Sequence, residues 1–144
     1  MISRRKGREF ALQALYASEV GDSTLEKAAD TLMHDDPVSP EMREYGLKLA
    51  RAARKRAVEI DALIGDTSEK WDVERLAVVD RIILRLSIAE LMTEPDIPSK
   101  VCINEAVEIA RKFSTENSSA FVNGVLDAVS RKLQLPSTNS ASEN

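Results

Sequence analysis

The chain has few of the residues that build disulfides, metal sites and turns. Its 144 residues include one cysteine, one histidine, five glycines and five prolines. Cys102 has no partner for an internal disulfide, and we expect it to be a small buried apolar residue. His34 has no cysteine or second histidine near it in sequence. We therefore expect no metal site, and no cysteine–histidine pair for nucleophilic catalysis.

Long apolar runs and phosphate-binding loops are missing as well. No stretch approaches the roughly 20 apolar residues needed to span a bilayer, so we expect no membrane partner. The glycine patterns GxGxxG and Walker A do not occur, and no paired-carboxylate site can be picked out from the helical surface charge. With no signal peptide and a single cysteine, a cytoplasmic setting is expected. These absences favour a binding or scaffolding protein, with no catalytic residues and no cofactor, over an enzyme.

The residues that are abundant predict an all-α fold. Apolar residues make up 43% of the chain, which is enough for a core, and Ala, Leu, Glu, Lys and Arg dominate. At this length we expect one helical domain over residues 1–135. It has an N-terminal half of about 1–66 and a C-terminal half of about 67–135. A short polar tail, 136–144, is expected to be disordered.

Apolar spacing and capping residues place the helices. Ser23-x-x-Glu26 has the form of a capping box, and Ser39-Pro40 puts a capping serine before a first-turn proline. Gly124 falls in the middle of the last helix at a cost of about 1 kcal/mol relative to alanine, which suggests that another backbone or a ligand comes close. The predicted helices are about 5–20, 25–33, 40–64, 76–92, 102–113 and 121–133.

Charges on two of these helices allow two interpretations each. Asp80 and Arg85 interrupt the most apolar helix, where they either follow its one solvated stripe or line a partner's contact surface. A second basic cluster falls within residues 48–56, and such clusters are more often a solvated helix face than a binding site.

The start of the chain concentrates positive charge on an otherwise acidic sequence. Four of the 20 basic residues fall within the first eight positions, against 24 acidic residues in all. Because the N-terminus of a helix carries partial positive charge, cations there are mildly repelled. We interpret the cluster as a site for a polyanion, although a basic end without function remains the alternative. The four residues are Arg4, Arg5, Lys6 and Arg8.

Three stretches together resemble the NusB family of transcription antitermination factors. They are residues 4–16, residues 71–91, and residues 98–127, which include PSKVCINEAVEIARKF and SSAFVNGVLD. Their order and spacing match the family over most of the chain, whereas residues 22–66 match only as helices. The resemblance implies an all-α fold in which two packed helical bundles form one compact NusB-like domain.

The resemblance also implies a function. Such proteins pair with a small-subunit ribosomal protein, NusE, and the heterodimer binds boxA, a single-stranded element of ribosomal RNA transcripts. With other Nus factors on the RNA polymerase elongation complex, it promotes processive transcription of ribosomal RNA operons. The sequence leaves open whether the free chain is a monomer or a homodimer. Two other functions remain: a helical protein–protein adapter without an RNA role, and an RNA-targeting module for an RNA methyltransferase.

Site residues carried over from the family fall into two groups. The four cations at the start of the chain, called the basic arm, would contact phosphates and bases. Phe121 would stack on an unpaired base, which is worth about 1–3 kcal/mol. Asn117 and Ser118 would form hydrogen bonds with a base edge. The family often has an acid where this chain has Asn117, and an amide repels RNA less. The implied RNA-binding residues are Arg4, Arg5, Lys6, Arg8, Asn117, Ser118 and Phe121. Those implied to face the ribosomal protein are Tyr16, Glu74 and Asp80.

Both aromatic residues in these groups also have an ordinary structural explanation. Phe121 is apolar at helical spacing and could belong to the core. Tyr16 ends an apolar face and could be a boundary residue with its hydroxyl in water.

Overall fold

The structure is a computed structural model that describes residues 4–67 and 72–133. Over these residues the chain forms seven α-helices and no strand, so the predicted all-α fold class is confirmed. Trp71 and the tail 136–144, for which we made predictions, lie outside the described residues. The elements are α1 (Arg5–Gly21), α2 (Leu25–Asp35), α3 (Pro40–Lys55), α4 (Ala57–Gly65), the 3-10 helix η1 (Val73–Arg75), α5 (Val78–Thr93), α6 (Ser99–Phe113) and α7 (Glu116–Lys132).

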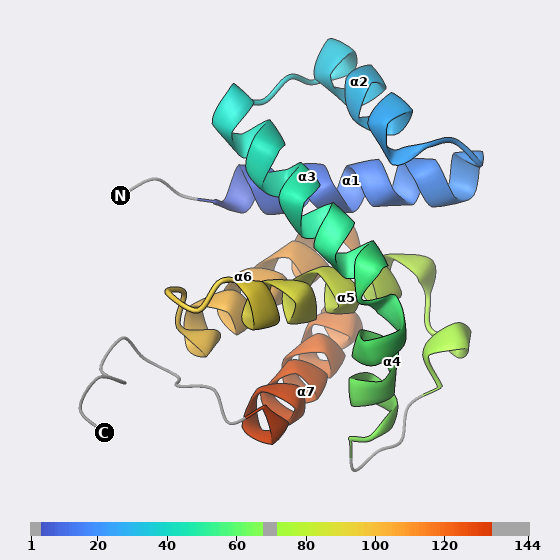
Figure 1. Cartoon of the computed structure of the whole chain (residues 1–144). Helices are drawn as coiled ribbons and strands as arrows, with labels where there is room; N and C mark the ends of the chain where they lie inside the picture. The colour runs from blue at the N-terminus through green and yellow to red at the C-terminus, as the bar shows by residue number, and fades with distance from the viewer. Residues whose placement is uncertain (1–3, 68–71, 134–144) are drawn as a thin grey trace.

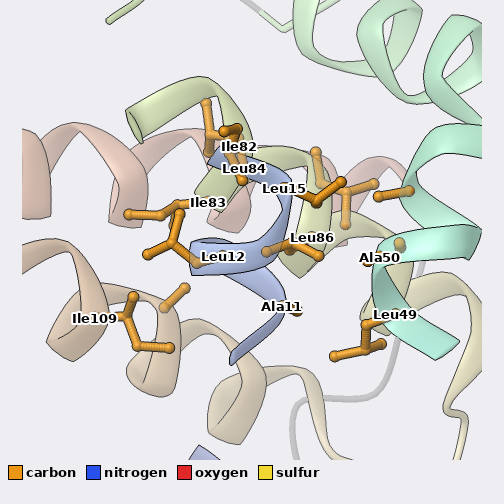
Figure 2. Packing of buried hydrophobic residues seen from close by; sticks show 14 of the residues in the cluster. Ala11, Leu12, Leu15, Leu49, Ala50, Ile82, Ile83, Leu84, Leu86 and Ile109 are labelled. Carbon is orange, nitrogen blue, oxygen red and sulfur yellow. The ribbon is translucent and has the colours of Figure 1, made fainter. Parts of the chain in front are cut away.

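Helix α5 lies between two groups of helices (Figure 1). Helices α2 and α3 pack on α1, helix α7 packs on α6, and α5 contacts α1, α3, α4, α6 and α7. The apolar core runs through both groups without interruption. Figure 2 shows Leu12 and Leu15 of α1 among Leu49 of α3, Ile83 of α5 and Ile109 of α6. None of the described helices is both long enough and apolar enough to cross a lipid bilayer.

Capping side chains set several helix starts. Ser39 accepts a hydrogen bond from the Met42 amide at 3.2 Å, so the predicted cap of α3 is confirmed. The predicted capping box at Ser23 is wrong by one residue, because Thr24 accepts from the Lys27 amide at 3.1 Å. Helix α7 begins earlier than predicted, since Thr115 caps it.

The long helix predicted over residues 40–64 is in fact two helices. Helix α3 ends at Lys55, Arg56 leaves helical geometry with φ of −105° and ψ of 19°, and α4 begins at Ala57. The break turns α4 away from α3, so that Ile60 and Ile64 are buried where α4 contacts α5 and α7. Tertiary burial therefore outweighs the continuity of the local helical pattern.

The crossing of α1 and α3 depends on two glycines. A Cβ atom added to Gly46 would lie 2.6 Å from the carbonyl oxygen of Gly7, and one added to Gly7 would lie 3.1 Å from the Met42 carbonyl. At Gly124 an added Cβ meets nothing within 4 Å among the described residues, so no backbone comes close there, and the alternative of a ligand stays a prediction. The close backbone approach that we predicted at Gly124 is thus found at Gly46.

Candidate nucleic-acid interface

The four cations at the start of α1 have two different environments. Lys6 is exposed, and the guanidinium of Arg4 lies 5.1 Å from the centre of the Tyr45 ring, in cation–π range. Arg5 and Arg8 instead reach across the molecule to carboxylates on α6 and α5. Arg4 and Lys6 are therefore the cations of this cluster that are best placed to meet a polyanion.

Arg8 is held by a buried carboxylate. Its Nε atom lies 2.9 Å and 3.0 Å from the two oxygens of Glu90, and the side chains of Arg8 and Glu90 are only 10% and 2% exposed. The same carboxylate accepts hydrogen bonds from the Tyr45 hydroxyl and, at 3.2 Å, from the Cys102 thiol. The guanidinium of Arg8 is thus held in an ion pair inside the protein, and its contact with RNA stays a prediction.

Burial raises the pKa values of two groups that contact Glu90. Burial raises the pKa of the Cys102 thiol well above its usual range, and the negative charge of Glu90 raises it further. The pKa of the Tyr45 hydroxyl is raised for the same two reasons. Both groups therefore stay protonated and donate to the carboxylate. This cluster of α1, α3, α5 and α6 side chains holds the start of α1 in place.

Glu105 on α6 forms a second and more open ion pair. Arg5 donates from Nε at 2.6 Å and from Nη2 at 3.0 Å to its two oxygens, and Arg8 Nη1 lies 3.4 Å away. The Arg5 and Glu105 side chains are 33% and 25% exposed. Hydrogen bonds from Arg5 lower the pKa of the Glu105 carboxyl below its ordinary value. Solvent and a ligand can reach this pair, unlike the pair of Arg8 and Glu90.

The C-terminal end of α6 adds a cation to the same side of the molecule. Lys112 lies 3.0 Å from the carboxylate of Glu9 on α1, and its ammonium is 5.3 Å from the centre of the Phe113 ring. Helices α1 and α6 run in the same direction (Figure 1), so the pairs Arg5–Glu105 and Glu9–Lys112 join them along their length. Helix α6 ends one residue after Lys112, at Phe113, and two residues then lead into α7.

The predicted residues of the α6–α7 turn have different orientations. Asn117 is exposed, and Phe121 is half-buried and packs against the edge of the core. Ser118 turns inward, and its hydroxyl donates to an oxygen of Asp80 at 2.8 Å. Ser114 donates to the other oxygen of Asp80 at 2.8 Å. Asn117 therefore lies at the surface, Phe121 lies at the edge of the core, and the Ser118 hydroxyl connects α7 with α5.

Asp80, in the first turn of α5, is held by two serines from the chain that follows α6. The residue is 8% exposed, and its carboxylate accepts from Ser114, which follows α6, and from Ser118 of α7. Its contact with a protein partner stays a prediction. Asp80 lies in the first turn of α5, where a negative charge also interacts favourably with the helix dipole. Its role in this structure is to connect α5 with the start of α7.

The other two residues predicted to face a protein lie at the far end of α1. Tyr16 is 42% exposed, and Val20, one turn further along, is 60% exposed. Glu74 in η1 is exposed. Arg85 of α5 is held by Asp61 of α4, whose carboxylate oxygens lie 2.9 Å and 2.7 Å from its Nε and Nη2 atoms. The end of α1 and η1 both lie on the right of Figure 1. The end of α1 thus exposes apolar side chains, and η1 exposes an acidic one.

Sequence reasoning did not assign roles to Tyr45, Glu90, Glu105 or Lys112. One signal was available for Glu90, because a carboxylate in the middle of an apolar helix needs a cationic partner when it is buried. That partner, Arg8, is 82 positions away, and periodicity within one helix does not identify it.

The geometry defines an all-α protein whose first helix begins with cations and ends with exposed apolar and acidic side chains. The family model described as "NusB family" matches residues 5–131. A transcription antitermination protein NusB of Myxococcus xanthus is 44% identical over 140 residues, covering 94% of this chain and 100% of that protein. The chain therefore belongs to the NusB family.

Solved structures give the same result. NusB of T. maritima aligns with a TM-score of 0.82 and 36% sequence identity, covering 99% of each chain. A chain in the structure described as "Antitermination Factors NusB and NusE in complex with dsRNA" aligns with a TM-score of 0.80 and 28% identity, covering 92% of this chain and 99% of that one. The predicted family is thereby confirmed over nearly the whole length.

Proposed function

We propose that the chain is a transcription antitermination factor that binds boxA-type RNA of ribosomal RNA transcripts together with NusE. It acts in the cytoplasm on the RNA polymerase elongation complex with other Nus factors, and it has no catalytic role. Family membership supports this function, as does the related structure whose description names NusB, NusE and double-stranded RNA. The observation that carries the proposal is the pair of accessible cations at the start of α1, Arg4 and Lys6.

The RNA surface that we propose has a basic part and a stacking part. Arg4 and Lys6 contact phosphates, and Arg5 joins them when it exchanges Glu105 for a phosphate. Asn117 bonds a base edge and Phe121 stacks on an unpaired base, because sequence is read in RNA mainly from unpaired bases.

The surface for NusE lies at the other end of α1. Tyr16 and Val20 offer exposed apolar area, and Glu74 contributes negative charge. Opposite charge on a partner steers its approach and orients it on this surface. A small RNA surface with few cations gives only modest affinity, so the partner is needed to extend the RNA contact.

The test is an RNA titration with and without NusE, using a boxA-like single strand, a scrambled single strand and a duplex. The variant Arg4→Ala with Lys6→Ala removes two cations from the RNA surface. The matched control is Arg131→Ala with Lys132→Ala, which removes two exposed cations from the last turn of α7.

We expect the first variant to weaken RNA binding and to reduce the salt slope by about 1.4, since each phosphate contact to a single strand contributes about 0.7. The control should behave as the unmodified chain. If Arg4→Ala with Lys6→Ala leaves the RNA affinity and its salt slope unchanged while NusE still binds, the result would instead support a protein–protein adapter.

A further inference from the structure

We propose that Glu105 is a specificity-determining residue that competes with RNA phosphates for Arg5. In the absence of a matching RNA the carboxylate occupies the guanidinium, and RNA must displace it. The inference rests on the proposed function, since it concerns the same basic surface. Glu105 would thereby lower the affinity of the protein for RNA that binds only through its phosphates.

The geometry of the pair carries the inference. The two carboxylate oxygens of Glu105 face Nε and Nη2 of Arg5 at 2.6 Å and 3.0 Å, which is the bidentate arrangement that a phosphate also adopts on a guanidinium. A phosphate and Glu105 therefore use the same donors. Unless the carboxylate moves, its negative charge also repels the incoming phosphate.

The position of the pair makes exchange feasible. Because both side chains are partly exposed, the bond between them is screened by water and contributes little net stability. The neighbouring pair of Arg8 and Glu90 is sealed in the interior and does not exchange at such low cost. The structure thus has one fixed ion pair that anchors α1 and, one helical turn away, one exchangeable pair at the surface.

Competition of this kind acts unequally on different RNAs. For a strand that supplies only phosphates, the free energy needed to displace Glu105 is subtracted in full from the binding free energy. Such a strand therefore binds more weakly. A matching strand also gains base contacts at Asn117 and Phe121, and these offset that cost. Specificity is the difference between the two affinities, so a competing carboxylate widens it.

The decisive variant is Glu105→Gln, which keeps the size of the side chain and removes its charge. The matched control is Glu108→Gln, which removes an equal charge one turn along α6, where Glu108 pairs with Arg111 at 2.6 Å on the exposed surface. Dissociation constants for the boxA-like and scrambled single strands are measured with NusE across a series of salt concentrations. Glu105→Asp is a second variant, because it keeps the charge but its shorter side chain withdraws from Arg5.

We expect Glu105→Gln to bind the scrambled strand about fivefold more tightly at 0.1 M salt, with a salt slope steeper by about 0.7, the value of one added phosphate contact. Binding of the boxA-like strand should improve less, so the ratio of the two affinities falls. Glu105→Asp should change in the same direction by a smaller factor, and Glu108→Gln should leave the ratio unchanged.

Weaker binding of both strands to Glu105→Gln would overturn the inference and make Glu105 a positioning residue. An equal gain in Glu105→Gln and Glu108→Gln would also overturn it, because the effect would then be general charge. In either case the proposed function stands if the unmodified chain binds RNA and Arg4→Ala with Lys6→Ala weakens it. Absence of RNA binding by the unmodified chain with NusE would overturn both.

Discussion

Arg8 and Glu90 form the most buried ion pair among the residues that the structure describes, and they connect the first helix to the central one. The carboxylate of Glu90 also receives the Tyr45 hydroxyl and the Cys102 thiol, so side chains of four helices meet there. This arrangement explains how a chain with a cationic helix start keeps that start ordered. The interior carboxylate offsets the repulsion between the helix dipole and the cations.

Removal of Arg8 should destabilise the protein strongly. Arg8→Ala leaves the Glu90 charge buried without its cation, which typically costs about 3–5 kcal/mol. Urea unfolding followed by circular dichroism measures the loss. Arg131→Ala, which removes an exposed arginine from α7, should change the free energy of unfolding by less than about 0.5 kcal/mol. Equal effects of the two substitutions would contradict the anchoring role of the buried pair.

Cys102 should report on the integrity of this cluster. It is the single cysteine of the chain, it is buried, and its raised pKa keeps the reactive thiolate scarce. Reaction with a disulfide reagent, followed by absorbance, should therefore be slow in the native protein. Tyr45→Phe removes one hydrogen bond to Glu90 and should accelerate the reaction by loosening the cluster. Fast labelling of the unmodified chain would show that the thiol is not enclosed as described.

Stability should depend on the ionisation of Glu105 in acid. The folded-state pKa lies below the ordinary value of 4.5, so the carboxylate stabilises the fold above that value. This contribution is lost as the pH falls from about 4.5 through the lower folded-state pKa. The unmodified chain should thus be more stable than Glu105→Gln at pH 7, and the difference should disappear in acid. Thermal unfolding of both proteins at a series of pH values measures this difference in stability. A difference that grows as the pH falls would contradict the prediction.

Two glycine substitutions should have opposite effects. Gly46→Ala places a methyl group 2.6 Å from the Gly7 carbonyl, so α1 and α3 must separate, at a cost of about 1–3 kcal/mol. Gly124→Ala meets nothing within 4 Å and lies in a helix interior, where alanine is better by about 1 kcal/mol. Urea unfolding should move the two variants in opposite directions. Destabilisation by Gly124→Ala would indicate a close approach that the described residues do not contain.

The fold could be predicted from the sequence where local signals and tertiary packing agree. Apolar spacing gave α1 and α5 nearly to their ends, and Ser39 with Pro40 marked the start of α3. The break at Arg56 could not be predicted, because the residues around it favour a continuous helix and only burial of α4 against α5 and α7 explains it.

The candidate site was harder to predict because the charges pair over long separations in sequence. Arg5 pairs with Glu105 across 100 positions and Arg8 pairs with Glu90 across 82, and no spacing rule within a helix connects them. Family resemblance supplied the cations of the arm but not the carboxylates that hold two of them. It likewise did not indicate the two serines that donate to the carboxylate of Asp80.

The most direct measurement of the central claim is amide hydrogen exchange of the chain alone, with NusE, and with NusE and a boxA-like RNA. We predict that NusE protects the end of α1 around Tyr16 and the segment around Glu74. RNA should then add protection at residues 4–12 and 114–121. Protection by RNA confined to other parts of the chain, or none at all while NusE protects its surface, would contradict the proposed RNA surface.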